Sequence, residues 1–143
     1  MTHRTIVRVR FGELDPYSHV NHAVYVAWFE AGRGEALHDV GMSLGRMAES
    51  GWQMVVTDLH VAYRIPAVAG DEVTIETIVS DIRGATCAWR QRALRAGPSG
   101  EDVVLCVAEL RAGVTDLHGR PMRMSADVKS ALALLAAPAE PPV

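Results

Sequence analysis

The sequence lacks the features that direct a protein to nucleic acid or to a membrane. It has no excess of basic residues, because 14 Lys and Arg stand against 17 Asp and Glu and give a net charge of -3. No general positive field therefore attracts nucleic acid or an anionic membrane, and an anionic ligand must be met by a local basic patch. No uninterrupted run of about 18 apolar residues is present to span a bilayer. We expect neither nucleic acid nor a membrane among the partners.

Features of secreted proteins are scarce as well. The N-terminal residues MTHRTIVRVRF alternate polar and apolar side chains and contain no apolar segment or cleavage site of a signal peptide. The two cysteines, Cys87 and Cys106, both lie in apolar, strand-like runs, where a free thiol behaves as a small hydrophobic group. We interpret both as reduced core residues and not as a disulfide, which indicates a cytoplasmic protein.

The composition is that of a globular protein with a sizeable core. Of the 143 residues, 49% are hydrophobic and 22% are charged, which is too apolar for a disordered chain. This length suits one domain and is too short for two ordinary ones. We expect a single domain over residues 1–137, followed by a Pro-rich tail, residues 138–143, that is disordered.

The pattern of apolar residues predicts the order of the elements. Alternation over Thr5–Phe11 predicts a first strand, and helical spacing from Asn21 predicts a helix of about 17 to 20 residues. Asn21 is the expected N-cap and Gly41 the expected stop, and the helix should be mostly buried because apolar residues surround it. The remaining expected elements are strands at Gln53–Arg64, Glu72–Ile82, Ala85–Arg95 and Val103–Val114, and short helices at Ser43–Ser50 and Ser125–Ala136.

One strand, a long helix and four further strands predict an α+β fold. A single five-stranded antiparallel sheet wrapped around the long helix satisfies this order, because such a sheet can bury one face on the helix. The strands at Gln53–Arg64 and Val103–Val114 are apolar on both faces, which one helix cannot explain. We therefore expect a second subunit to cover the remaining apolar surface, giving a homodimer or homotetramer.

The segment between the first strand and the long helix contains the candidate catalytic residues. Asp15 precedes a proline, and an aspartate in this place can simply form a turn by bonding to its own backbone. Alternatively, the helix that begins at Asn21 offers free backbone N–H groups and the positive end of its dipole. These groups could polarise a carbonyl while the Asp15 carboxylate attacks it or activates water, an arrangement that suits acyl transfer.

The histidines of this segment allow a metal site as another interpretation. His19 and His22 are three residues apart and, with Asp15, form a ligand set that is common in metal sites. However, they lie across a junction between a loop and a helix and need not face one point, and no regular metal motif is present. We therefore predict no metal at these residues.

The segment also resembles a known family. VRFGELDPYSHVNHAVYVAWFEAGR, residues 9–33, is similar to a motif of the hotdog-fold acyl-CoA thioesterases of the 4-hydroxybenzoyl-CoA thioesterase type. A second similarity is a strand that ends in Tyr63-Arg64-x-Pro66 and is followed by Gly70-Asp71. Together these motifs and the order of the elements extend the resemblance over roughly residues 5 to 118. In the first motif the matching residues are Asp15, His19, Val20, Asn21, Tyr25, Phe29, Glu30 and Arg33.

The resemblance implies a fold and a mechanism. It implies a hotdog fold and an acyl-CoA thioesterase in which Asp15 is the nucleophile or general base and the backbone N–H of His22 polarises the thioester carbonyl. His19, Asn21 and Tyr25 complete the predicted catalytic set. It also implies an active site at a subunit interface, with pantetheine between the subunits, the nucleotide near the surface and no metal or organic cofactor.

Two positions depart from the family pattern, and a related group offers rival residues. Ser18 stands where the family usually has Gly, and His22 stands where Asn is frequent, although its role through the backbone tolerates the change. A sister group of hotdog thioesterases uses a carboxylate inside the long helix. Glu30 and Glu35 are therefore the rivals of Asp15.

The phosphates of CoA require basic residues near the mouth of the pocket. Arg64, Arg83, Arg120 and Arg123 end strands or lie in loops and are the candidates, although an arginine in such a place is more often a plain surface charge than a ligand. Two alternatives to acyl-CoA hydrolysis remain open: hydrolysis of a thioester on acyl carrier protein, and a non-catalytic module that binds acyl groups. A hotdog hydratase is disfavoured because its His-x-Asp motif is not found. The sequence leaves the acyl group undetermined.

Overall fold

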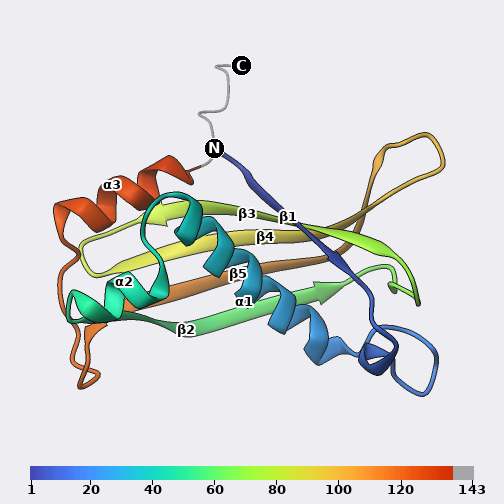
Figure 1. Cartoon of the computed structure of the whole chain (residues 1–143), viewed down its shortest axis with the longest axis horizontal. Coiled ribbons are helices and arrows are strands. Elements are labelled where there is room, and N and C mark those ends of the chain that lie inside the picture. Colours follow the sequence, from blue (N-terminus) through green and yellow to red (C-terminus); the bar gives the residue numbers. More distant parts are fainter. Residues whose placement is uncertain (137–143) are drawn as a thin grey trace.

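Five antiparallel strands form one open sheet, and the helix α1 crosses one of its faces (Figure 1). The computed structural model describes residues 1–136, so the expected Pro-rich tail lies outside them. The strands are in the order β1-β3-β4-β5-β2, and this arrangement confirms the predicted α+β class and five-stranded sheet. The elements are β1 (His3–Arg8), the 3-10 helix η1 (Phe11–Glu13), α1 (His22–Asp39), α2 (Leu44–Glu49), β2 (Trp52–Tyr63), β3 (Glu72–Ile82), β4 (Thr86–Ala96), β5 (Asp102–Asp116) and α3 (Ala126–Leu134).

The long helix α1 begins and ends where the sequence predicts. The Asn21 side chain accepts a hydrogen bond from the backbone N–H of Ala23, as an N-cap does, and Gly41 has a φ of 81° in the left-handed region. Only six of its eighteen residues are buried. The expectation of a mostly buried helix is therefore wrong for a single chain, because the sheet covers one face of α1 and the opposite face is open.

The first strand is shorter than expected. β1 ends at Arg8, which pairs with Glu72, the first residue of β3, so no partner strand extends further. Beyond it, the backbone N–H of Arg10 donates to Glu13 Oε1, and the chain turns into η1. Phe11, expected in the strand, is 89% exposed. The prediction of a strand up to Phe11 was wrong because alternation continues past the point where pairing stops.

The core contains the large aromatic residues and both cysteines. Cys87 and Cys106 are buried and free, which confirms their interpretation as reduced core residues. Burial raises the pKa of the Cys87 thiol to about 11 and that of Cys106 to about 12, so both remain protonated at neutral pH. Four large aromatic residues are packed in the core: Trp28, Phe29, Trp52 and Trp89.

Close packing and a buried amide fix α1 on the sheet. At Gly32 a Cβ atom would lie 2.7 Å from Ile75 Cγ2, so the helix approaches β3 as only glycine permits. Next to it, Gln91 Nε2 donates to the carbonyl oxygen of Phe29 at 2.8 Å and to Thr77 Oγ1 at 2.9 Å. These contacts set the depth of α1 above the sheet, and so the position of its N-terminus.

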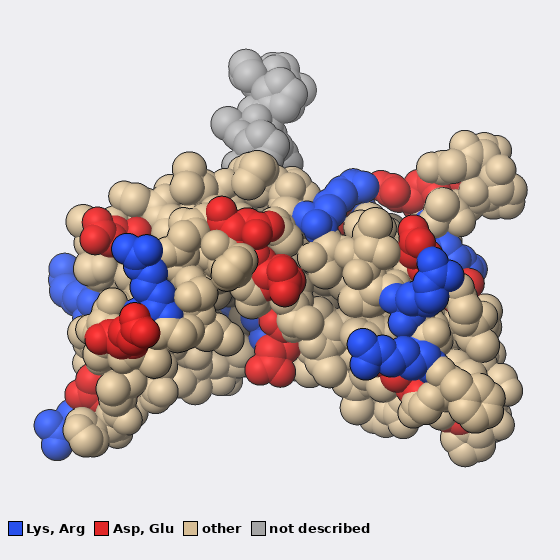
Figure 2. Space-filling view, viewed as in Figure 1, with Lys and Arg blue, Asp and Glu red and all other residues tan. Residues whose placement is uncertain are grey.

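Within residues 1–136, no helix is long and apolar enough to cross a membrane. Figure 2 shows that Lys and Arg on this face lie in separate groups with Asp or Glu near them, and do not form one continuous basic area.

Candidate active site

Asp15 lies in a tight turn that its own carboxylate helps to form. Asp15 Oδ1 accepts hydrogen bonds from the backbone N–H groups of Tyr17 at 2.8 Å and His19 at 3.1 Å. The main chain closes the same turn, because the Asp15 N–H donates to the carbonyl of His19 at 2.7 Å. Within residues 1–136, no group donates to the second oxygen, Oδ2. One carboxylate oxygen therefore holds the turn while the other remains available.

Ser18 adopts the conformation that explains why the family prefers glycine here. Its φ is 60°, and it is the one non-glycine residue with positive φ among residues 1–136. A side chain in this left-handed region costs energy that glycine avoids. With Ser18 in this conformation, the turn is still closed by the hydrogen bonds of Asp15 with Tyr17 and His19.

A second turn in the protein has the same construction. Asp116 Oδ1 accepts from the N–H groups of His118 at 2.8 Å and Arg120 at 2.9 Å, and Gly119 takes the positive φ. The Arg120 and His118 N–H groups lower the pKa of the Asp116 carboxyl. The turn geometry alone therefore does not distinguish a catalytic aspartate, and the surroundings of Asp15 must do so.

Those surroundings include the N-terminus of α1. Asn21 Oδ1 is occupied by the N–H of Ala23, and the N–H of Val24 donates to the Asn21 carbonyl. The N–H of His22, the first residue of the helix, has no acceptor within residues 1–136. It is a free donor at the positive end of an eighteen-residue helix, where a developing negative charge is stabilised.

Asp15 and His22 line the same pocket, which has a volume of about 380 Å³. The sequence-predicted residues His19, Tyr25 and Arg64 also line it, whereas Asn21 acts beside it through the helix cap. A pocket of this size falls within the range of small-molecule sites. The structure thus brings together a carboxylate oxygen, a free N–H donor and one exposed arginine.

Two tyrosines connect this pocket to the sheet. Tyr25 is buried, and its hydroxyl accepts a hydrogen bond from the backbone N–H of Ala67 at 2.9 Å, which holds the β2–β3 connection against α1. Tyr63, at the end of β2, donates from its hydroxyl to the carbonyl of His22 at 2.7 Å. Burial raises the pKa of both phenols, so both stay protonated at neutral pH. The sequence singled out Tyr63 only as part of a motif and gave it no role.

Glu13 is a second residue that sequence reasoning missed. Its Oε1 accepts from the N–H of Arg10, and its Oε2 accepts from Trp28 Nε1 at 3.1 Å. Its backbone carbonyl accepts from the N–H of Asn21 at 2.9 Å. Glu13 therefore ties the start of the Asp15 loop to α1. The Arg10-to-Glu13 spacing is a capping pattern that the expectation of a continuous strand concealed.

The structure does not bring the other predicted arginines to this pocket within one chain. Arg64 follows Tyr63 at one end of β2, whereas Arg120 and Arg123 follow Asp116, which pairs with Trp52 at the other end. The eleven residue steps of β2 separate these ends by roughly 36 Å. Arg83 also lies at the far end, in the β3–β4 turn, where its Nε donates to Asp81 Oδ2 at 2.9 Å.

The rival carboxylates lie away from the Asp15 pocket. Glu30 is eight residues beyond His22 on α1, roughly 12 Å along the helix. It lines a different pocket, of about 360 Å³, together with Arg33. Glu35 is exposed and lines neither pocket. Among residues 1–136, no group of three His, Cys, Asp or Glu side chains is placed to hold a metal ion, so His19 and His22 do not form a metal site with Asp15.

Comparison with known proteins identifies the family. The sequence profile of the thioesterase-like superfamily matches residues 9–132. The chain belongs to this superfamily. It is 30% identical over 127 residues to the acyl-CoA thioesterase YbgC of Haemophilus influenzae, covering 87% of this chain and 90% of that one. It is 27% identical to the acyl-acyl carrier protein thioesterase ATL3 of Arabidopsis thaliana, covering 90% of this chain and 66% of that one.

Solved structures agree on the fold. A 4-hydroxybenzoyl-CoA thioesterase structure superimposes with a TM-score of 0.85 at 20% identity, covering 92% of this chain and 98% of that one. The profile match confirms the predicted thioesterase family, and this likeness confirms the predicted hotdog fold. The chain spans only 56% and 66% of the length of the first two curated relatives that it matches.

Proposed function

We propose that this protein hydrolyses acyl-CoA thioesters, with Asp15 as the catalytic carboxylate and the N–H of His22 as the oxyanion-hole donor. The observation that carries the proposal is that Asp15 Oδ2 and the His22 N–H are both free of partners within residues 1–136 and border one pocket. The name of the Haemophilus relative supports CoA as the carrier.

The reaction needs little more than these two groups. Asp15 either attacks the thioester carbon directly or removes a proton from a water molecule that attacks it. The negative charge that develops on the carbonyl oxygen is met by the His22 N–H and the helix dipole. The carbon–sulfur bond then breaks, and the thiolate, whose pKa is about 8.5, leaves without a strong general acid. After direct attack the acyl group is held on Asp15 as a mixed anhydride, which a water molecule hydrolyses to the free acid and the Asp15 carboxylate. Neither a metal nor an organic cofactor takes part in this scheme.

A substrate comparison tests the proposal. One acyl group should be offered as a thioester of CoA and of acyl carrier protein, and the release of free thiol followed. We expect a higher kcat/KM with CoA over a panel of short, long and aromatic acyl groups. A preference for carrier protein would favour the activity named for the Arabidopsis relative. Binding of the thioesters without release of thiol would favour a non-catalytic acyl-binding module.

Tyr63 should support catalysis without contacting the reacting atoms. Its hydroxyl holds the first carbonyl of α1, so replacing Tyr63 by Phe should let the helix start shift while the ring still packs on Tyr25. We expect kcat to fall about tenfold and KM to stay nearly unchanged. The helix start loses one hydrogen bond, and the His22 N–H is then positioned less accurately. Steady-state kinetics on the preferred thioester measures both constants.

The matched control for Tyr63→Phe is Thr115→Val. The Thr115 hydroxyl also donates to a backbone carbonyl, that of Asp116, at 2.8 Å, but at the opposite end of the sheet. This variant should keep its kcat. Equal losses of kcat in both variants would indicate a general effect on the fold, and an unchanged kcat in Tyr63→Phe would remove its positioning role.

We further propose that two chains form a homodimer along β2. β2 is an edge strand of twelve residues, and Val55, Val56 and Leu59 on it are 43%, 43% and 42% exposed. A long apolar edge strand is a surface that proteins normally cover or pair. In Figure 2 the outline of the molecule is hollowed along the edge that Figure 1 shows to be β2. A second copy would add its own β2 there.

An antiparallel pairing of the two β2 strands would complete the active site. It places the Trp52 end of one strand beside the Tyr63 end of the other. Arg120 and Arg123 of one subunit would then approach the Asp15 pocket of the other, where they could meet the phosphates of CoA. The separation of these arginines from Asp15 within one chain is consistent with a site that two subunits build.

Replacing Leu59 by Lys should convert the protein to a monomer, because it places a charge in the apolar edge that would be buried. Light scattering coupled to gel filtration measures the mass. Ile6→Lys is the matched control, since Ile6 is 65% exposed on β1, the other edge strand. Ile6→Lys should remain dimeric. The reverse outcome would place the interface on β1.

A further inference from the structure

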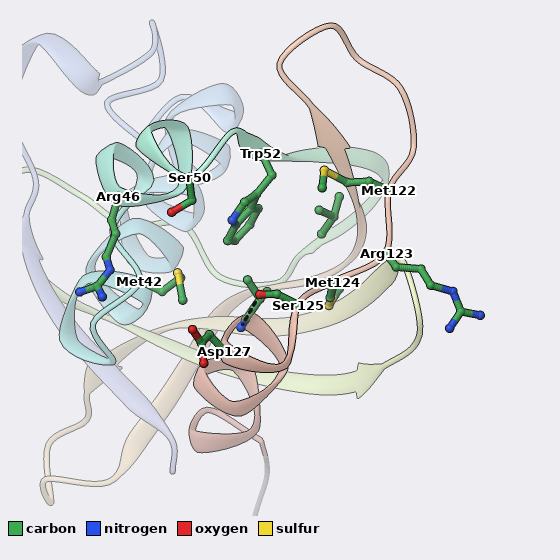
Figure 3. A pocket seen from close by; sticks show the side chains of 11 residues that line it. Met42, Arg46, Ser50, Trp52, Met122, Arg123, Met124, Ser125 and Asp127 are labelled. Atoms are coloured by element: carbon green, nitrogen blue, oxygen red, sulfur yellow. Dashed lines mark hydrogen bonds between the residues drawn. The ribbon is translucent and has the colours of Figure 1, made fainter.

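A second pocket lies at the opposite end of β2 from Asp15. It is enclosed by α2, the starts of β2 and α3, and the end of β5 (Figure 3). Trp52 is at its centre, and we call it the Trp52 pocket; Met42, Arg46, Ser50, Met124 and Asp127 are among its lining residues. Because roughly 36 Å of strand separates Trp52 from Tyr63, this pocket is distinct from the one that Asp15 lines in the same chain.

The Trp52 pocket has the size and the apolar walls of a small-molecule site. Its volume is about 590 Å³, within the range in which such ligands are enclosed. Met42, Met122 and Met124 all line it, and methionine side chains adapt to apolar ligands of differing shape. Trp52 adds a flat, rigid surface. These walls suit a ring or a short hydrocarbon chain.

One polar group in this pocket stands out. Of the three tryptophans, Trp28 donates from its Nε1 to Glu13 Oε2 at 3.1 Å, and Trp89 donates to Cys87 Sγ at 3.2 Å. Trp52 is only 7% exposed, yet within residues 1–136 its Nε1 has no acceptor. In Figure 3 the indole nitrogen lies on the side of the ring that faces Arg46 and Met42. Among residues 1–136, Trp52 Nε1 is not one of the fully enclosed polar atoms that lack a partner, so this N–H is open to the pocket and can donate to an acceptor bound there.

The charges at the rim favour an anionic acceptor. Arg46 lines the pocket and forms no ion pair with another residue of 1–136. Arg123 lines the pocket with the aliphatic part of its side chain, since Figure 3 shows its guanidinium extended away from the other labelled side chains. Asp127 is the single acidic residue in the lining. An oxygen that accepts from Trp52 while carrying charge toward Arg46 is a carboxylate.

We propose that the Trp52 pocket binds a small apolar carboxylic acid, with its hydrocarbon part among the methionines and its carboxylate between Trp52 Nε1 and Arg46. This binding does not require turnover. The acids released by thioester hydrolysis belong to the same chemical class. In the antiparallel dimer proposed above, Arg123 of this pocket approaches the Asp15 pocket of the other subunit, so the acid would be held beside the site where that subunit forms it.

The three indole N–H groups allow a direct test by NMR. The uniformly ¹⁵N-labelled protein should be titrated with benzoate, hexanoate and octanoate up to the millimolar range, and each indole signal assigned by its Trp→Phe variant. We expect the Trp52 signal to move downfield and to saturate, as the N–H gains an acceptor. The Trp89 signal should not move, because its N–H is already bonded to sulfur. Trp28, bonded to Glu13 beside the Asp15 loop, reports independently on binding near Asp15.

Two variants measure the contribution of the polar groups. Trp52→Phe keeps an aromatic ring and removes the donor together with part of the ring surface, and Arg46→Gln removes the charge; each should weaken binding of the preferred acid about tenfold by calorimetry. Trp89→Phe is the matched control and should bind normally. The proposal is overturned if the Trp52 signal stays in place while the acids bind elsewhere or not at all. It is equally overturned if Trp52→Phe binds as tightly as the unmodified protein.

Discussion

Replacing Asp15 by Asn should lower kcat for thioester hydrolysis by about a thousandfold or more, the scale on which losing a nucleophile or general base acts. The amide keeps an oxygen that can accept from the N–H groups of Tyr17 and His19, so the turn should survive. What is lost is the negative charge on the free oxygen. Single-turnover and steady-state kinetics measure the loss of activity. Thermal unfolding verifies that the fold and its stability are retained.

The protein contains its own control for this substitution. Asp116 forms the same turn, with the same pair of backbone donors two and four residues later, but it does not line the pocket with His22. Asp116→Asn should therefore leave kcat unchanged. Activity retained by Asp15→Asn over a broad acyl-CoA panel would contradict the assignment and direct attention to Glu30, which Glu30→Gln would then test.

A pair of glycine substitutions in α1 should change stability in opposite directions. Gly32 and Gly34 are both inside the helix, where alanine is favoured over glycine by up to about 1 kcal/mol. At Gly34 a Cβ atom would meet nothing within 4 Å, so Gly34→Ala should stabilise the protein by roughly that amount. At Gly32 the Cβ would lie 2.7 Å from Ile75 Cγ2, and overpacking of this kind costs about 1–3 kcal/mol.

Gly32→Ala should consequently destabilise the protein despite its better helix propensity. The new methyl group would also press on Thr77 Oγ1 and Gln91 Nε2, at 3.2 Å and 3.3 Å, and so on the hydrogen bonds that hold α1 to the sheet. Urea unfolding at one fixed protein concentration compares the two variants. Equal stabilisation by both would show that α1 can move away from β3 at little cost.

The same substitution should also reduce activity. A displaced α1 moves its own N-terminus, and with it the His22 N–H, away from the carbonyl that it is proposed to polarise. The stability effect and the activity effect would thus have one cause. Gly34→Ala, which leaves the packing intact, should keep normal kinetics.

Local signals in the chain were sufficient for most elements. Asn21, Ser43 and Ser125 each cap the helix that follows them, because their side chains reach backbone donors only two or three residues away. Such interactions do not depend on the rest of the fold. The first strand was misjudged for the opposite reason: its end at Arg8 depends on where β3 begins, more than sixty residues later in the chain.

The candidate site divides in the same way. Asp15 and the helix start at His22 are close in sequence, so the motif and the physical chemistry of a helix N-terminus identify them together. Tyr63 is separated from His22 by forty-one residues, and its hydrogen bond exists only because β2 ends beside α1. The arginines were selected for their loop positions, and only the strand order shows that Arg120 and Arg123 lie far from Asp15 within one chain.

By itself, the sequence determined the helices, the strands, the turn at Asp15 and the family to which the chain belongs. Only the motif separates that turn from its counterpart at Asp116, since the local geometry of both is built from contacts within five residues. The tertiary structure adds a physical difference, because it places one of the two turns beside a free helix N-terminus in a pocket. A carboxylate becomes a candidate catalyst through the groups that distant parts of the chain bring next to it.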